Sequence, residues 1–124
     1  MSFRQFLQQA ADSGALVTID KTVDTTFELA NVAHALEGRP VLFNQVKDYP
    51  GWRVCAGPCS DRQYFSMDLA ISPADLTQHL AQALDNPQLP PIVESGPCQE
   101  VVVEDVDLYQ LPILLHLPQD AGHY

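Results

Sequence analysis

The sequence predicts a mixed fold of the α/β (α+β) class, in which helices pack on a mixed β-sheet and a proline-rich extended arm follows at the carboxyl end. Three observations predict it. Apolar residues make up 46% of the 124 residues, which is ordinary for a globular chain. Helical periodicities alternate with short runs of strand-forming residues before Pro87. Six of the ten prolines lie between Pro87 and Pro118, and proline favours extended chain.

The first helix is expected between Ser2, which can cap its start, and Gly14, which can end it in the left-handed conformation. Its apolar residues recur at offsets 0, 3, 4, 7 and 8, as one face of a helix requires: Phe3, Phe6, Leu7, Ala10 and Ala11. A short strand is expected over residues 15–20, where Leu16, Val17 and Ile19 supply the apolar content.

The second helix is expected to begin near Thr25, because Thr25 and Glu28 have the spacing of a capping box. Its buried face would contain Leu29, Val32, Ala33 and Leu36, and Gly38 would end it. Strands are expected over residues 41–46 and 52–56, with a turn over residues 47–51 between them.

Two further helices and a fourth strand complete the expected elements. One helix spans residues 61–70. The next is capped by Ser72, has Pro73 in its first helical position and presents an apolar face made of Leu76, Leu80, Ala83 and Leu84. The strand is expected over residues 99–106, where Val101, Val102 and Val103 follow one another, and such a run suits a strand covered on both faces.

The chain is expected to divide into a scaffold domain over residues 1–107 and an extended arm over residues 108–124. Each leucine or isoleucine of the arm would contribute about 1.5–3 kcal/mol if buried, and would promote association if exposed. The arm therefore either folds back or continues into a further domain, so we expect a fragment of a longer protein that self-associates when isolated. The apolar residues concerned are Leu111, Ile113, Leu114, Leu115 and Leu117.

Charge is distributed unevenly along the chain, whose net charge is −10. Residues 1–62 carry −1, whereas residues 63–124 contain nine acidic residues and no Lys or Arg, and carry −9. This balance disfavours nucleic acid and anionic membranes as partners. The start of the sequence lacks a signal pattern, no apolar run is long enough to cross a bilayer, and the cysteines are few and odd in number, so a cytoplasmic protein is expected.

The clusters of side chains that could bind a metal ion match the requirements of a metal site poorly. Cys55 and Cys59 lack the second ligand pair of a zinc site, and Cys98 stands alone. His116, Asp120 and His123 have helical spacing, but Pro118 and Gly122 disfavour a helix there. The three side chains are therefore not expected to converge on a metal ion.

The remaining candidates are isolated. His34 is expected on the polar flank of its helix, and His79 is expected as a partly buried structural residue. Glu104 and Asp105 would point to opposite faces of a strand. The sequence contains no nucleophile elbow and no glycine-rich phosphate loop. It therefore predicts no catalytic, cofactor-binding or metal-binding residue.

The order of segments along the whole chain resembles the amino-terminal region of the UbiD-type carboxy-lyases, decarboxylases that use prenylated FMN. The matching segments are Phe3–Leu7, Gly14–Ile19, Val23–Asp24, Phe27–Ala30, Val41–Lys47, Gly96–Val102, Asp105–Leu108, Leu111–Ile113 and Asp120–Tyr124. The segments from Gly96 onward are the most specific. One departure is Cys55-Ala56-Gly57, where relatives often carry an asparagine-containing turn.

The resemblance implies non-oxidative decarboxylation of an aromatic or α,β-unsaturated acid by the parent protein, in which the flavin accepts the electron density left as carbon dioxide departs. It implies prenylated FMN, a divalent metal and potassium for the parent, all bound in a domain beyond residue 124. Residues 1–124 alone would be an inactive structural and assembly domain of a homo-oligomer. The alternatives are a stand-alone acidic interaction module with the same fold, and a small thiol or zinc protein.

Overall fold

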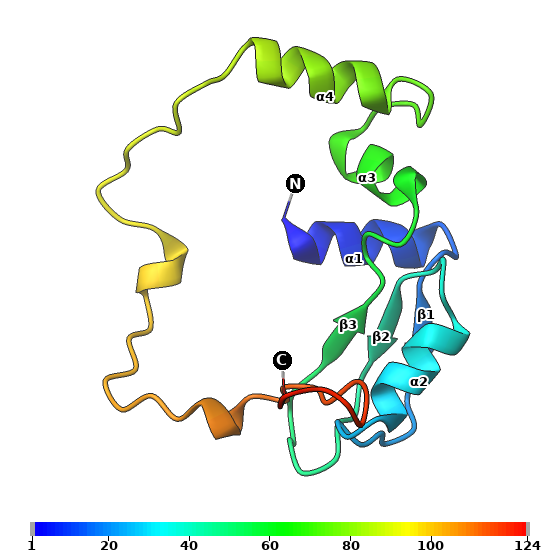
Figure 1. The fold of residues 1–124 in the computed structure, drawn as a ribbon. Coiled ribbons are helices and arrows are strands. Elements are labelled where there is room, and N and C mark those ends of the chain that lie inside the picture. Colours follow the sequence, from blue (N-terminus) through cyan, green and yellow to red (C-terminus); the bar gives the residue numbers. More distant parts are fainter. Residues whose placement is uncertain (1, 124) are drawn as a thin grey trace.

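The computed structural model describes residues 2–123, which form four α-helices, three strands and two short 3₁₀ helices. Figure 1 shows their path: the last helix leads into a long segment that bows away from the sheet and then returns to it. In chain order the elements are α1 (Phe3–Asp12), β1 (Val17–Ile19), α2 (Glu28–Ala35), β2 (Val41–Phe43), β3 (Val54–Ala56), α3 (Arg62–Leu69), α4 (Leu76–Asp85), η1 (Pro97–Gln99) and η2 (Leu108–Gln110).

The sheet is mixed, as the sequence predicted, and has the order β1-β2-β3. β1 and β2 are parallel, with Val17 opposite Val41, and β2 and β3 are antiparallel, with Val41 opposite Ala56. The parallel pair needs a crossover connection, and α2 provides it. The expected strands over residues 15–20, 41–46 and 52–56 are confirmed in shorter form.

The core lies between the sheet and α2. Its fully buried cluster consists of Val23, Leu29, Val41 and Phe43. Partly buried side chains from β1, β3 and α2 pack around the cluster, and so does Leu114 from the far end of the chain. The apolar face predicted for the second helix is therefore confirmed.

The helices α1 and α3 begin where local signals predict. Ser2 Oγ accepts a hydrogen bond from the Gln5 amide at 3.3 Å, and Gln5 Oε1 accepts one from the Ser2 amide at 2.8 Å, which completes a capping box. Asp61 caps α3 through the Gln63 amide at 2.9 Å. Gly14 follows α1 with φ +73°, in the left-handed region.

The start of α2 differs from the prediction by three residues. The helix begins at Glu28, and the Glu28 carboxylate accepts a hydrogen bond from the Asp24 amide at 2.9 Å rather than capping Thr25. The physical reason lies in the arm: the Thr25 carbonyl and the Phe27 amide are both bonded to Leu115. Residues 25–27 therefore pair with another segment and are not available as the first turn of the helix.

The predicted start of α4 at Pro73 is also wrong. Ser72 Oγ accepts from the Ala74 amide at 3.2 Å, and the Asp75 amide donates to the Ser72 carbonyl at 3.0 Å, so residues 72–75 form a turn before the helix starts at Leu76. Only Leu76 of the predicted apolar face is buried, whereas Leu80 is 49% and Leu84 83% exposed. The described residues leave most of this face uncovered.

The predicted strand over residues 99–106 is absent from the described chain. Residues 97–99 form η1, and residues 101–106 have neither helical nor strand structure. A strand needs a neighbour to bond its amides and carbonyls, and no described segment runs beside these residues. Figure 1 shows them in the segment that bows away from the sheet.

Replacement of Leu29 by alanine should test the core directly. Leu29 has no exposed surface, so Leu29→Ala should lower the free energy of unfolding by about 2–5 kcal/mol in urea titration, because it removes buried methyl groups and leaves a cavity. Leu89→Ala is the matched control: Leu89 is 95% exposed, and its loss should change stability by less than about 0.5 kcal/mol. Equal effects of the two changes would contradict the assigned core.

Candidate functional site

Residues 111–115 dock on the segment that precedes α2, so part of the predicted arm folds back on the domain. Leu115 lies in a parallel bridge with Thr26: its amide donates to the Thr25 carbonyl at 3.1 Å and its carbonyl accepts from the Phe27 amide at 2.9 Å. Leu114 packs against the core cluster. Sequence analysis did not identify this contact, although the apolar content of the arm indicated that it needed cover.

The turn after the docked segment is held by the residues considered above as metal ligands. Asp120 Oδ2 accepts hydrogen bonds from the amides of His116 at 3.0 Å and Leu117 at 2.8 Å. His123 Nδ1 donates to the Ile113 carbonyl at 2.9 Å. These contacts fold the turn, and among residues 2–123 no three His, Cys, Asp or Glu side chains gather in a geometry that could hold a metal ion. Tyr124, the last residue of the matching segments, lies outside the described residues.

An exposed ion pair supports the same docking point. Lys47 Nζ lies 2.7 Å from Asp24 Oδ2, and Asp24 Oδ1 accepts from the Thr26 amide at 2.9 Å. The hydrogen bond from Lys47 lowers the pKa of Asp24 below its ordinary value, and Asp24 in turn raises the pKa of Lys47. Since the pair is largely in contact with water, its main effect is to hold the shape of the backbone that receives Leu115.

Two of the hollows on the described surface have largely apolar linings. One, of about 600 Å³, separates the turn after β2 from the arm and is lined by Tyr49, Leu108, Tyr109, Leu111, Ile113 and His123. The other is an apolar groove of about 510 Å³ between α1, α3 and α4, lined by Phe3, Phe6, Pro58, Cys59, Tyr64, Phe65, Asp68, Leu69 and Leu80. Neither hollow contains a Lys or Arg that could bind a carboxylate or a phosphate.

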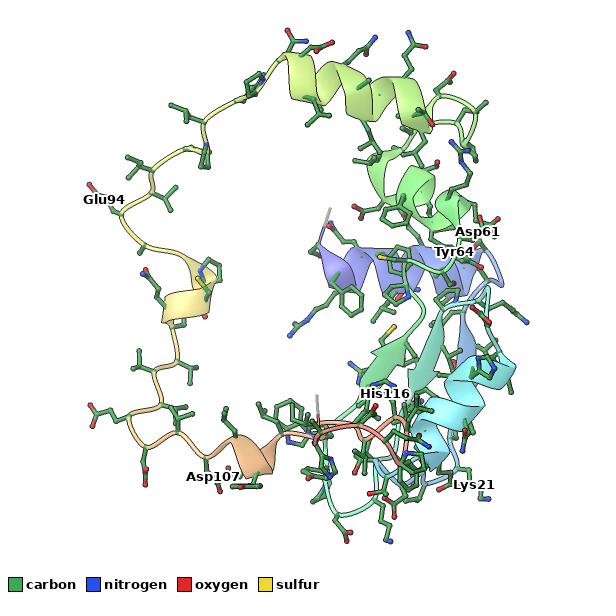
Figure 2. All side chains as sticks on the ribbon, viewed as in Figure 1. Lys21, Asp61, Tyr64, Glu94, Asp107 and His116 are labelled. Carbon is green, nitrogen blue, oxygen red and sulfur yellow. The ribbon has the colours of Figure 1, made fainter. Side chains whose placement is uncertain are left out.

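Tyr64 anchors the floor of the groove. Its ring meets Phe6 edge-on, with the centroids 6.4 Å apart, and its hydroxyl donates to the Gly38 carbonyl at 3.1 Å. Figure 2 shows Tyr64 on α3, facing α1. The hydroxyl thus ties α3 to the turn that follows α2, while the ring packs against α1.

The three cysteines are free thiols in separate environments. Cys55 is half-buried on β3, whereas Cys59 and Cys98 are exposed. Burial, followed by the neighbouring Cys59, raises the pKa of Cys55 to about 11. A thiol that remains protonated at neutral pH is a poor nucleophile, so Cys55 has the properties of a packed residue.

The other sequence candidates are dispersed over the surface. His34 lies 3.7 Å from Glu37 in an exposed pair on the polar side of α2, as expected. His79 is exposed rather than partly buried, because no described segment covers its side of α4. Glu104 and Asp105 lie in an exposed bend and not on a strand.

Comparison with known proteins decides the family. The family model described as the 3-octaprenyl-4-hydroxybenzoate carboxy-lyase N-terminal domain matches residues 7–84, which is more than half of the chain. The chain belongs to this family. Its UbiD-type fold is also found in solved enzymes. The evolved dimeric form of the UbiD-class enzyme HmfF from Pelotomaculum thermopropionicum, in complex with prFMN, has 31% sequence identity and a TM-score of 0.89 over 98% of this chain and 30% of that one.

Other UbiD-type relatives differ in their substrates. Anhydromevalonate phosphate decarboxylase of Methanosarcina mazei is 30% identical over the whole of this chain and 28% of its own length. Pyrrole-2-carboxylic acid decarboxylase of Pseudomonas aeruginosa is 31% identical over all of this chain and 29% of its own. The apo 3,4-dihydroxybenzoic acid decarboxylase of Enterobacter cloacae has 32% identity and a TM-score of 0.83 over 97% of this chain and 28% of that one. The chain thus spans less than a third of each.

The described residues do not fit prenylated FMN. A flavin phosphate requires cations, a metal or a cradle of backbone amides, and the carboxyl-terminal half of this chain contains no Lys or Arg. The two hollows described above are lined mainly by apolar and aromatic groups, and the Lys47 that lines a smaller, polar hollow is paired with Asp24. Residues 2–123 hold no candidate metal cluster. No helix within that range is both long and apolar enough to cross a membrane.

Leu115→Pro should release the arm. Proline removes the amide that bonds to the Thr25 carbonyl, and Thr25 is buried, so the free energy of unfolding should fall by about 1–3 kcal/mol as that carbonyl loses its partner. Hydrogen exchange at the Phe27 amide should accelerate. Ile92→Pro is the control, because Ile92 is fully exposed and makes no hydrogen bond to a described residue. Unchanged exchange at Phe27 in Leu115→Pro would refute the docking.

Cys55 should resist alkylation. Because the pKa of Cys55 is raised to about 11 from an ordinary value of 9.0, its thiolate fraction at pH 8 should be about 100-fold below that of an ordinary thiol, and labelling should slow accordingly. Peptide mass spectrometry after iodoacetamide treatment measures this, with a sample labelled in urea as the control. Cys55 that reacts as fast as Cys59 and Cys98 in the folded chain would contradict its packed environment.

Proposed function

We propose that this chain is the amino-terminal structural and assembly part of a UbiD-type decarboxylase that acts on an aromatic or α,β-unsaturated carboxylic acid. The observation that carries the proposal is the shared fold with HmfF, whose solved complex contains prFMN and whose chain aligns with 98% of this one. In the whole enzyme the modified flavin would supply the electron sink for loss of carbon dioxide. The substrate acid is left open, since the named relatives act on different acids.

The residues of this chain would contribute packing contacts to the whole enzyme. Residues 1–107 act as the scaffold, and residues 108–124 form the arm that leads into a cofactor-binding domain, with prenylated FMN, a divalent metal and potassium held there. The arm is well placed for this role, because residues 114 and 115 are fixed on the scaffold while Leu108, Tyr109 and Leu117 remain exposed. The acidic half would face basic surfaces of that domain or of a sister subunit in a homo-oligomer. Free cysteines support a cytoplasmic location.

Cofactor retention tests whether the flavin binds outside residues 1–124. Residues 1–124, incubated with prenylated FMN, Mn²⁺ and K⁺ and passed through gel filtration, should elute without flavin absorbance. The described residues hold no candidate metal cluster, and Lys47, which lines a polar hollow, is paired with Asp24. The full-length protein treated in the same way should retain the flavin and release carbon dioxide from a member of a panel of aromatic and unsaturated acids. Flavin that elutes with residues 1–124 would refute the placement of the cofactor site outside these residues. A full-length protein that retains the flavin but decarboxylates no acid would refute the proposed activity.

A further inference from the structure

The segment Glu100–Val106, called here the valine segment, has the composition of a buried strand but none of the contacts of one. Its valines are 63–79% exposed, namely Val101, Val102, Val103 and Val106. Residues 101–106 take part in no hydrogen bond between described residues. Four β-branched side chains and a row of unbonded amides and carbonyls in water form an edge ready to pair with another strand.

The alternation of residues in the segment indicates what must cover it. In an extended strand, Val101 and Val103 point to one face, and Val102 and Val106 to the other. Each face therefore carries two valines together with at least one carboxylate, and burial of each valine would contribute about 1.5–3 kcal/mol. Valines on both faces favour a strand that is covered on both sides. The described part of this chain provides no such cover beside it.

We propose that the valine segment becomes a strand by adding to the exposed edge of a sheet in the part of the enzyme that follows residue 124. This inference rests on the proposed function. It differs from the general expectation that the arm leads onward, since it assigns a pairing mode, backbone addition, to residues that precede the arm. The strand would form only when both parts of the protein are present.

The comparisons favour the following part of the enzyme as the partner. The family model of the amino-terminal domain ends at residue 84, yet the Methanosarcina mazei relative aligns over the whole chain and is more than three times as long. The valine segment thus lies beyond the domain that the family model describes, in a region shared with complete decarboxylases. Most of the relative's length is available to supply the sheet.

A second copy of this chain is a weaker partner. The edge strands of its sheet are β1 and β3, and each has only three residues, whereas the valine segment has seven. Whichever edge receives the segment must also accommodate four nearby carboxylates: Glu100, Glu104, Asp105 and Asp107. No Lys or Arg follows Arg62 to neutralise them. We therefore expect the receiving edge to be flanked by Lys or Arg side chains.

Amide hydrogen exchange tests the pairing without a variant. In residues 1–124 alone, the amides of residues 101–103 should exchange at the rate of unstructured chain. In the full-length protein, exchange at these amides should slow by about 100-fold or more, as is typical of paired strands. Amides of residues 88 and 89, in the same extended stretch, serve as the internal reference and should remain fast in both. Fast exchange at 101–103 in the full-length protein would overturn the proposal.

A matched pair of proline variants tests it independently. Val102→Pro and Ile92→Pro each remove one exposed apolar side chain and one amide from the extended stretch. In residues 1–124 both should leave stability unchanged. In the full-length protein only Val102→Pro should lower the melting temperature and accelerate exchange at residues 101 and 103, because proline blocks strand pairing. Equal behaviour of the two variants in the full-length protein would overturn the assignment.

The outcomes separate this inference from the proposed function. A full-length protein that decarboxylates an acid while residues 101–103 exchange freely would refute the strand and leave the activity standing. A protected segment in a protein without decarboxylase activity would support the strand and refute the activity. Protection in residues 1–124 alone that increases with concentration would overturn the choice of partner, because a second copy would then be pairing with the segment.

Discussion

The parallel bridge between Leu115 and Thr26 is the contact on which the arrangement of the described chain depends. It joins two segments nearly ninety residues apart through two backbone hydrogen bonds. It occupies the polar groups of residues 25–27, so that α2 starts only at Glu28, and it brings Leu114 against the core. Because buried amides and carbonyls must be bonded, one pairing decides both the start of a helix and the return of the arm.

Features set by local chemistry could be predicted from the sequence. Ser2 and Asp61 cap their helices through neighbouring amides, and Gly14 takes the left-handed conformation that ends a helix. The apolar stripe of α2 was sufficient to identify the face that packs on the sheet. In each case the deciding interaction lies within a few residues of the signal, so a single sequence contains it.

Features set by distant partners could not be predicted in the same way. Thr25 and Glu28 satisfy the spacing of a capping box, but the backbone of residues 25 and 27 is hydrogen-bonded to Leu115 instead. The valines at 101–103 have strand propensity without a neighbouring strand among residues 2–123. Asp120 was weighed as a metal ligand, whereas it binds two backbone amides. The expectation of no catalytic or cofactor-binding residue remains a prediction, because it concerns chemistry that the described fold does not test.

The extended stretch between α4 and η2 acts as a tether of about twenty residues. The tether keeps the arm at a high effective concentration near Thr26. An arm that dissociates from this site therefore rebinds quickly. The entropic penalty of such a closure grows only logarithmically with contour length, at about 0.6 kcal/mol per doubling. Insertions between α4 and the valine segment should therefore cost little stability, because they lengthen the tether and leave the pairing of Leu115 with Thr26 unchanged.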